Sequence, residues 1–486
     1  MISAGRQRPG QGFDVAVIGG GVLGTAVAAR LSCTTASVCL LEAETDVCEG
    51  ASKGNAGIAV SYYGPPGTLE TELINRSYPG WEALCQRLNV PYRRIGAVMV
   101  ALDEAEAERL GSTLAQLREA GVRGQLLEPG QVRRLEPLVT ERCVAGLQMP
   151  DEGVIDSIAL TVAYANLAAT NGAPVRLGAR VTAIRREDDG TSRVDFTGGS
   201  VRARFVVNAA GVAAGAISAM AGGEELRCWP GKGQYAVLDR VLGQRLGHIV
   251  FCTHSAATKG VNVVPTTHGS ALLGPTALDT GDPEDKATDP DTVAALIRSA
   301  ARLVPVIAPD FVMKTFAANR PAGDEPHRLR FDRQVGNLLH CTNRSAGVSI
   351  CPAAAEMTLA MLRQSGLDAG ERPDAARALP HRARLRTEAE PERLIEQDPL
   401  FGQVVCACEQ VSAAEINYAL DMPVPATSVD GVRKRTGAGY GRCQGSLCTA
   451  DISLMTALHT GAGPASVRQT ARGTVGSVGS GGSVGA

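Results

Sequence analysis

The sequence predicts an α/β fold with a Rossmann-like dinucleotide domain, an interleaved mixed-sheet substrate domain and a small α-rich module at the C-terminal end. A strand, a glycine turn and a helix follow one another over residues 14–31. Short β-like apolar runs recur between 175 and 274, and two close cysteine pairs lie near the end of the chain. At 486 residues the chain is long enough for two or three domains.

The composition excludes some classes of partner. There are 48 basic and 50 acidic residues, a net charge of −2, so the chain lacks the basic surplus of a nucleic-acid-binding protein. No segment reaches the roughly 18 to 20 uninterrupted apolar residues of a membrane span. Three glycines interrupt the apolar run Val15–Ala29, which argues against a signal peptide. We therefore expect a cytoplasmic protein, attached to a membrane at most through a partner.

The N-terminal segment has the pattern of a dinucleotide-binding βαβ unit. A buried strand over 14–19 leads into Gly-Gly-Gly-Val-Leu-Gly, an apolar helix continues to Leu31, and a second strand over 37–42 ends in an acid. This context is the one that makes a Gly-x-Gly-x-x-Gly pattern specific. It predicts dinucleotide binding.

Each position of the pattern has a physical role. Gly19 permits the tight turn, Gly21 lets a pyrophosphate approach the backbone, and Gly24 allows the helix to pack closely on the strand. The helix N-terminus offers unpaired N–H groups to the phosphates. Glu42, eighteen residues after Gly24, is placed to accept hydrogen bonds from ribose hydroxyls.

Three further glycine-rich segments point to the same ligand. The small, polar loop 50–57 follows the ribose acid, so its backbone and the side chains of Ser52 or Asn55 are expected to contact the cofactor. A strand over 201–209 ends in small residues and a glycine, which puts bare backbone against a ligand. Another glycine, Gly347, stands at the entrance of a helix expected to run to about Gln364.

The remaining elements suggest how the domains are interleaved. Strands are expected at 97–102 and at 175–185 and 201–209 around a charged turn, with an amphipathic helix over 104–120. Three further runs, 231–238, 261–265 and 270–274, are expected to form a second sheet. The predicted division assigns the cofactor domain to about 13–60, 150–215 and 316–365, the substrate domain to about 61–149 and 216–315, a linker to 366–400, the cysteine module to 401–462 and a disordered tail to 463–486.

The cysteine pairs Cys406/Cys408 and Cys443/Cys448 are the most informative feature of the chain. Close pairs joined by a long excursion gather four thiolates around iron or zinc. Ser412-Ala-Ala-Glu415 is a capping box that starts a helix after the first pair. The basic run 433–435, with Arg442, is expected to offset the charge of a thiolate-ligated centre.

The first 365 residues resemble the flavin-dependent oxidoreductases of the D-amino-acid oxidase superfamily, in particular its glycerol-3-phosphate and L-2-hydroxyglutarate dehydrogenase branch. The resemblance implies FAD, a mixed antiparallel sheet that roofs the substrate pocket, and the Gly347 loop near the flavin ring. It rests on motifs in order along the chain: Gly19 to Gly24 with Glu42, Ser52-Lys-Gly-Asn-Ala-Gly57, Val206-Val-Asn-Ala-Ala-Gly211, Lys232-Gly-Gln-Tyr235, Leu273-Gly-Pro-Thr276, Arg320-Pro321 and Ser345-Ala-Gly347. The cofactor-binding residues that we carry over are Gly19, Gly21, Gly24, Glu42, Ser52, Asn55, Gly57, Val181, Ala210, Gly211, Gly347 and Val348.

The C-terminal module resembles the bacterioferritin-associated-ferredoxin-like [2Fe–2S] domain. The likeness is carried by Val405-Cys-Ala-Cys-Glu409, Arg433-Lys-Arg-Thr436 and Gly441-Arg-Cys-Gln-Gly-Ser-Leu-Cys448. It implies that the four cysteines hold a [2Fe–2S] cluster. Zinc remains the chemical alternative, since four thiolates also suit it.

One position departs from the dehydrogenase branch. A histidine usually follows the Asn-Ser-Gly stretch there by a few residues, and the matching position in this chain is Val60. A histidine would be a candidate proton acceptor for an alcohol. Without it the catalytic base is unassigned, and an amine, which needs no such base when it binds neutral, becomes a competing substrate.

We therefore expect a FAD-dependent dehydrogenase that oxidises a small anionic hydroxy acid, polyol phosphate or amino acid by hydride transfer to the flavin. Electrons would pass through the cluster to an acceptor protein or a quinone-linked subunit. Arg320 is the first candidate to bind the substrate anion, because a guanidinium fork suits carboxylate and phosphate. Tyr62 and Tyr63 are candidates to close the pocket. The alternatives are a non-catalytic flavin and iron–sulfur relay subunit, or an opine or amino-acid oxidase-type subunit.

Overall fold

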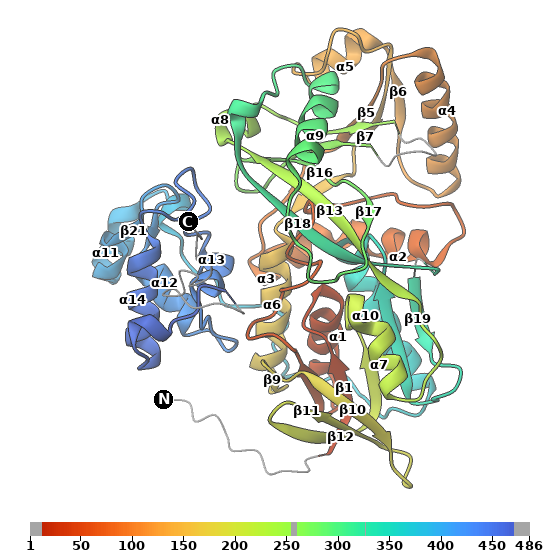
Figure 1. Ribbon diagram of the computed structural model, residues 1–486, viewed down its shortest axis with the longest axis vertical. Coiled ribbons are helices and arrows are strands. Elements are labelled where there is room, and N and C mark those ends of the chain that lie inside the picture. The colour runs from red at the N-terminus through yellow and green to blue at the C-terminus, as the bar shows by residue number, and fades with distance from the viewer. Residues whose placement is uncertain (1–11, 254–259, 326, 471–486) are drawn as a thin grey trace, which may run out of the picture.

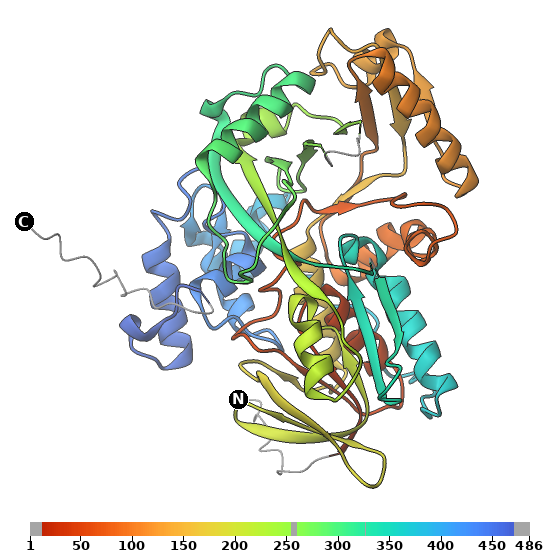
Figure 2. The ribbon, with the colours of Figure 1, turned by 45° about the vertical axis from the view of Figure 1, so that its right-hand side comes forward.

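The computed structural model describes residues 12–253, 260–325 and 327–470 (Figure 1). A parallel-sheet domain and a second sheet lie one above the other, and the C-terminal module packs beside them (Figures 1 and 2). The expected tail from 471 onward lies outside the described residues.

The first sheet has the parallel core that the fingerprint predicts. β1 pairs in parallel with β2 and β12, β2 with β9, and β12 with β20, while β10, β11 and β19 add antiparallel edges. Its strands are β1 (Gly12–Ile18), β2 (Val38–Leu41), β9 (Val175–Arg176), β10 (Val181–Arg186), β11 (Ser192–Phe196), β12 (Gly199–Asn208), β19 (His327–Phe331) and β20 (Leu338–Asn343).

Helices cover one face of this sheet and bury its core. The side chains of Val15, Val17 and Leu40 pack against three apolar helices, while Ala16 and Ile18 face the other core cluster under β10 to β12. The alternation follows from the period of two along a strand. The covering helices are α1 (Val22–Ser32), α6 (Ser157–Thr170) and α10 (Gly347–Gln364), and α7 (Ala214–Met220) contributes to the second face.

The second sheet is mixed and mainly antiparallel, as expected. Its centre is the long pairing of β13 with β18, which places Gly231 opposite Arg320. Only β14 and β5 pair in parallel among its described strands. The strands are β5 (Ala97–Ala101), β6 (Gln125–Leu127), β7 (Ala145–Met149), β13 (Cys228–Leu238), β14 (Ile249–Cys252), β15 (Asn262–Pro265), β16 (Ala271–Gly274), β17 (Leu278–Asp279) and β18 (Val312–Gly323), with helices α4 (Glu104–Glu119), α5 (Pro129–Leu135), α8 (Arg240–Gly243) and α9 (Pro290–Leu303) around it.

A small three-stranded sheet joins the two domains. β8 (Gly153–Ile155) lies between β3 (Ile58–Ala59) and β4 (Tyr92–Arg94) and pairs antiparallel with both. The chain enters and leaves the substrate sheet here, so this sheet borders both domains. The remaining short 3₁₀ helices are η1 (Tyr78–Gly80), η2 (Gly211–Ala213), η3 (Pro309–Phe311), η4 (Leu385–Thr387), η5 (Pro399–Gly402) and η6 (Pro464–Ser466).

The structure differs from the expected division in two places. α2 (Leu69–Ser77) and α3 (Trp81–Leu88), assigned to the substrate part, pack with Ile74 and Trp81 in the core of the cofactor domain. The charged turn near 187–190 joins β10 to an additional strand, β11, whose alternating burial is that of a half-buried strand.

The linker and the C-terminal module also pack more closely than expected. Residues 367–379 lie against the cofactor domain, where Glu371 pairs with Arg30, and 383–400 pack with the module. Val467, within the expected tail, is buried in the module core. The module elements are α11 (Pro391–Gln397), β21 (Val404–Cys406), β22 (Val411–Ser412), α12 (Ala413–Leu420), α13 (Val429–Thr436) and α14 (Thr449–Thr460).

A buried ion-pair network docks the module on the cofactor domain. Asp46 accepts two hydrogen bonds from Arg435, at 2.8 and 2.9 Å, and pairs with Lys434 at 2.8 Å. Lys434 also donates to the Val47 carbonyl at 2.9 Å, and both cations are fully buried. Two of the three residues of the basic run therefore hold the domains together instead of facing the cysteines, which corrects the role expected for them.

Replacement of Asp46 by alanine is expected to destabilise the protein. It would leave the buried Arg435 without its acidic partner, while Lys434 keeps only Glu49, and breaking such a buried pair costs about 3–5 kcal/mol. Burial opposes the charged form of Asp46, but Arg435 and Lys434 outweigh burial and lower its pKa to about 2. The stabilisation is thus present at neutral pH and lost as the pH falls from about 4 to about 2.

Denaturant unfolding measures this difference, with Asp374→Ala as the control. Asp374 makes an exposed ion pair with Arg372, which solvent screens, so its loss should change stability far less. Equal free energies of unfolding for the two variants would contradict the docking role of Asp46.

Candidate cofactor and substrate site

The glycine turn brings α1 against β1 as predicted. Gly19 has a φ of +111°, and a Cβ there would lie 2.4 Å from the Ala209 carbonyl oxygen. A Cβ on Gly24 would lie 1.9 Å from the Gly19 oxygen, so only glycine lets the helix pack at this distance. A Cβ on Gly21 would lie 3.2 Å from Ser52 Oγ, at the N-terminus of α1. The open backbone and the helix N-terminus form an anion cradle.

The acid at the end of β2 lies next to this cradle. Glu42 accepts hydrogen bonds from the backbone N–H of Gly20 at 2.5 Å and of Glu44 at 2.8 Å. Burial raises the pKa of its carboxyl group, and these two N–H groups oppose the rise. The glycine turn thus holds the Glu42 carboxylate beside the anion cradle, where the ribose of a bound dinucleotide would lie.

A cavity of about 1620 Å³ extends from the cradle across the domain boundary to the second sheet and the C-terminal module. Gly24 and Val181 do not border it. Gly24 lets α1 pack closely on β1, and Val181, the first residue of β10, is buried in the hydrophobic core. The neighbouring Arg180 borders it instead. The expected cofactor residues that do border the cavity are Gly19, Gly21, Glu42, Ser52, Asn55, Gly57, Ala210, Gly211, Gly347 and Val348.

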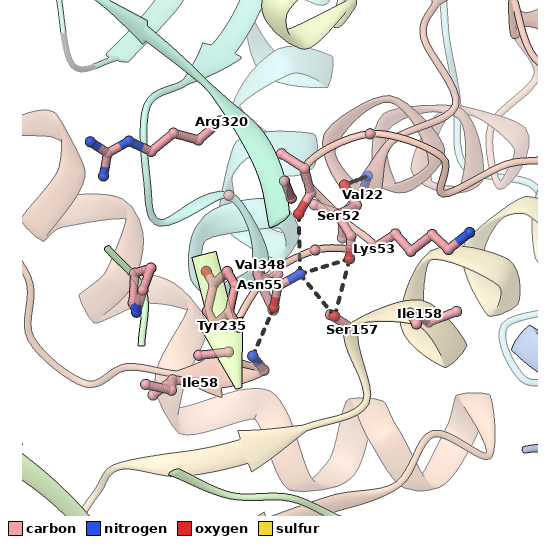
Figure 3. A pocket seen from close by; sticks show the side chains of 18 of the residues that line it. Val22, Ser52, Lys53, Asn55, Ile58, Ser157, Ile158, Tyr235, Arg320 and Val348 are labelled. Carbon is pink, nitrogen blue, oxygen red and sulfur yellow. Dashed lines mark hydrogen bonds between the residues drawn. The ribbon is translucent and has the colours of Figure 1, made fainter. Parts of the chain in front are cut away.

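The loop 50–57 is held by its own side chains. Asn55 donates to the Ser52 carbonyl at 2.7 Å and to Ser157 Oγ at 3.0 Å, and it accepts from the Gly57 N–H at 2.8 Å (Figure 3). Ser52 Oγ in turn accepts from the Val22 N–H at 2.9 Å, in the first turn of α1. Asn55 therefore shapes the cavity wall through its loop, while Ser52 positions the loop on the helix N-terminus.

The expected substrate residues also border the cavity. Arg320 extends from β18 to the side opposite Lys53 (Figure 3), and Gly231 leaves room for it, since a Cβ there would lie 2.8 Å from Arg320 Nε. The hydroxyl of Tyr62 donates to Gln116 at 3.1 Å on the substrate-sheet side, while Tyr63 packs against the cofactor domain. The two tyrosines thus lie on different walls.

Two cavity residues escaped the sequence reasoning. Arg344, between β20 and α10, borders the cavity with a buried Nε that has no partner among the described residues, as does Arg320. Glu152, which precedes β8, borders it with an unpartnered Oε2. Arg344 directly precedes the Ser345-Ala-Gly347 motif, so its position was a usable signal; Glu152 lies in no motif.

In space the four cysteines form two pairs, Cys408 with Cys443 and Cys406 with Cys448. The Cys443 thiol is hydrogen-bonded to Cys408, and backbone N–H groups, led by that of Leu447, lower its pKa to about 7. Burial and the neighbouring Cys406 raise the pKa of Cys448 to about 12. Among the described residues, no three cysteine sulfurs lie within 4.8 Å of one another. A zinc ion would gather all four sulfurs within about 4 Å, whereas two irons, each taking one pair, fit this arrangement.

The cysteine module forms part of the cavity wall. Cys408, Glu409 and Tyr440 border the same cavity as the glycine cradle. Glu409 is held by Arg386 of η4 at 2.9 Å and by a close ion pair with Arg240 of α8, beside the second sheet. Ion pairs on both sides therefore fix this edge of the module against the cavity.

Comparison with known proteins agrees with this geometry. The model of the FAD dependent oxidoreductase family matches residues 14–361. The chain belongs to this family. The model of the BFD-like [2Fe–2S] binding domain matches residues 404–455, which decides for the iron–sulfur cluster over zinc.

Two relatives align with more than nine tenths of this chain, and a solved structure with about three quarters of it. A glycerol 3-phosphate dehydrogenase of Caloramator mitchellensis is 31% identical over 92% of this chain and 95% of its own length. An anaerobic glycerol-3-phosphate dehydrogenase component of Escherichia coli K12 is 25% identical over 91% of this chain and 88% of its own. An FAD-bound L-α-glycerophosphate oxidase of Mycoplasma pneumoniae superimposes with a TM-score of 0.73 at 25% identity, over 76% of this chain and all of that one.

This FAD-dependent dehydrogenase therefore combines a flavin site with an iron–sulfur relay. The cradle that a Cβ at Gly21 would narrow and the acid Glu42 suit a dinucleotide, and the cysteine pairs suit two irons. Bound FAD supplies two-electron hydride chemistry, and the cluster passes single electrons.

Replacement of Gly21 by leucine is expected to abolish FAD binding without unfolding the chain, because the side chain would fill the cradle beside Ser52. The measurement is flavin released per chain after purification. Gly111→Leu is the control, since a Cβ on Gly111 in α4 meets nothing within 4 Å. Stoichiometric FAD in Gly21→Leu would refute the assigned turn.

Replacement of any one of Cys406, Cys408, Cys443 and Cys448 by serine is expected to remove iron and acid-labile sulfide, because each iron loses a thiolate. Cys85→Ala, at a buried position in the cofactor domain, should leave both unchanged. If metal analysis of the unaltered protein found zinc and no acid-labile sulfide, the electron-relay role would be refuted.

Proposed function

We propose that this chain oxidises a small anionic alcohol of the glycerol 3-phosphate type and passes the electrons through its cluster to an external acceptor. The observation that carries the proposal is the pair of cavity guanidiniums. Arg320 and Arg344 form no hydrogen bond or ion pair with the described part of the chain, although both have a buried Nε. A buried cation needs an anion, and a phosphate or carboxylate accepts from guanidinium forks. The two full-length dehydrogenase relatives support the same substrate.

The residues of this chain orient the substrate and exclude water. Tyr235 stacks on Phe316 with ring centroids 4.7 Å apart and forms an apolar wall beside Arg320. Tyr62 stands on the substrate-sheet side of the same cavity. An anion held at Arg320 would keep its carbon chain against these rings, while the segment 57–60 around β3 and the first turn of α10 would delimit the flavin side.

Anaerobic mixing with candidate substrates tests the reaction. Glycerol 3-phosphate is expected to bleach the flavin, and glycerol should not, because it lacks the anion. The apolar Val60 favours a second candidate, a small amino acid bound as the neutral amine; bleaching by proline or glycine, but not by glycerol 3-phosphate, would select it. If no substrate bleaches the flavin while a reduced partner does, the chain is a relay subunit.

We further infer that a separate protein, either an electron carrier or a quinone-linked subunit, receives the electrons. Leu447, between two cluster cysteines, is 73% exposed, and Leu454 and Leu458 on α14 are exposed as well. Exposed apolar side chains beside a redox centre suit a protein partner. No described helix has the length and apolarity to cross a bilayer, and we propose a cytoplasmic location. Faster reoxidation of the reduced protein by a carrier protein than by a soluble quinone would support a protein acceptor.

Replacement of Arg320 by alanine is expected to impair catalysis while the FAD content stays unchanged. Loss of a charge-assisted contact in a partly desolvated pocket costs about 2–5 kcal/mol, or roughly thirty- to several-thousand-fold in kcat/KM. Lysine should restore part of the loss, because it keeps the charge without the fork.

Arg227→Ala is the matched control, since Arg227 stands at the edge of the same sheet with an exposed side chain. Wild-type kcat/KM in Arg320→Ala would make Arg320 a structural residue and displace the proposed anion site.

A further inference from the structure

Glu152 stands opposite the position where the histidine is missing. β3 pairs with β8 through Ile58↔Val154 and Ala59↔Gly153, so the next step of this register brings Val60 opposite Glu152. The residue after Val60 contacts Glu152 directly: Glu152 Oε1 accepts from the Ser61 N–H at 3.0 Å and from Ser61 Oγ at 2.6 Å. Side chains opposite one another in an antiparallel pair share a face. Glu152 is thus the cross-strand neighbour of Val60.

The carboxyl group of Glu152 is buried but incompletely satisfied. The residue is 1% exposed, it borders the cavity, and its Oε2 has no partner among the described residues. Such an atom costs free energy unless something else pairs with it. A substrate hydroxyl in the cavity would supply the missing hydrogen bond.

Glu152 also lies close to the place where the segment 58–60 meets the start of α10, the two segments expected near the flavin. The Val60 N–H donates to Ser349 Oγ at 3.0 Å, and Ser349 Oγ donates to the Ile58 carbonyl at 3.2 Å. The 58–60 segment and the start of α10 therefore touch one residue away from the Ser61–Glu152 contact. A group at Glu152 faces the cavity from the substrate-sheet side of this junction, next to Tyr62.

We propose that Glu152 accepts the proton of the substrate hydroxyl, in place of a histidine at position 60. This rests on the proposed oxidation of an alcohol. In the step, the O–H bond breaks and its proton passes to the Glu152 carboxylate. The C–H bond breaks with its electron pair, which leaves as hydride to the flavin, and the C=O double bond forms. The substrate loses two electrons and two hydrogens, and the proton is later released to solvent.

The surroundings of Glu152 suit this role. Burial raises its pKa to about 7, although the Ser61 hydroxyl and N–H oppose the rise, and Asp151 adds to it. Asp151 is itself paired with Arg123 and lies 3.6 Å from Arg94. On the other side, the Tyr62 hydroxyl donates a hydrogen bond to Gln116. A group that titrates near neutral pH is the effective general base at that pH.

Two other titratable groups that border the cavity, His268 and Glu409, are engaged elsewhere. His268 Nε2 lies 2.8 Å from Asp156, on the side where Arg386 approaches. Glu409 also has an unpartnered oxygen, but Arg240 and Arg386 pair with its other oxygen and hold it at the edge of the module.

The test is the reductive half-reaction of Glu152→Gln with glycerol 3-phosphate. Its rate is measured from flavin bleaching at pH values between 5.5 and 9. In the wild type the rate is expected to rise with pH and to level off above about 7. Glutamine should lower the plateau by about 10²- to 10⁴-fold and remove the rise, while FAD content stays constant. Glu152→Asp, which keeps a carboxylate, should retain the rise at an intermediate rate.

A second readout does not depend on turnover. The infrared band of a protonated carboxyl group should disappear as the pH of the oxidised wild type passes through about 7, and Glu152→Gln should lack this change. Glu136→Gln is the control: Glu136 is buried and accepts from three backbone N–H groups, but it does not border the cavity.

Unchanged rates and pH dependence in Glu152→Gln, with bleaching intact, would overturn this inference and leave the proposed function standing. Absence of bleaching in the wild type at every pH would instead overturn the substrate. A carboxyl band that titrates identically in Glu152→Gln would assign the group to another residue and also count against Glu152.

Discussion

The buried pairing of Asp46 with Lys434 and Arg435 is the interaction on which the working arrangement depends. Asp46 lies four residues after Glu42, so one short segment carries both the acid of the dinucleotide turn and the anchor of the C-terminal module. Because unpaired buried charges are costly, the three groups strongly favour one docked position. The neighbouring pair of Lys53 with Asp430 extends the same interface to the loop that carries Ser52 and Asn55.

This docking gives the two redox sites a shared cavity. The glycine cradle, the face of the second sheet and the edge of the module at Cys408 border one space of about 1620 Å³. The pair of Glu409 with Arg240 ties that edge to α8, beside the second sheet, as well. The proposed substrate and flavin sites and the cysteine Cys408 therefore border one cavity, which would let a hydride acceptor pass electrons to a one-electron carrier within the same protein.

Features that depend on neighbouring residues could be predicted from the sequence. The strand, glycine turn and helix at 14–31 follow from local sterics, and both hydrogen bonds of the Ser412/Glu415 capping box form as expected. Contacts between distant residues could not be predicted. The acid that pairs with Lys434 and Arg435 is nearly 390 residues away, so the basic run looked like a shield for the cluster. Glu152 meets Ser61 only through strand pairing, and no motif marks it.

The most direct test is the order of electron arrival after substrate is added to the oxidised protein under anaerobic conditions. Flavin absorbance and the paramagnetic signal of the reduced cluster, sampled by rapid freezing, follow both sites in one experiment. The docked module predicts that flavin bleaches first and that the cluster is then reduced at a rate independent of protein concentration. A cluster reduction rate that rises with protein concentration, or a cluster that stays oxidised beside reduced flavin, would contradict an internal relay.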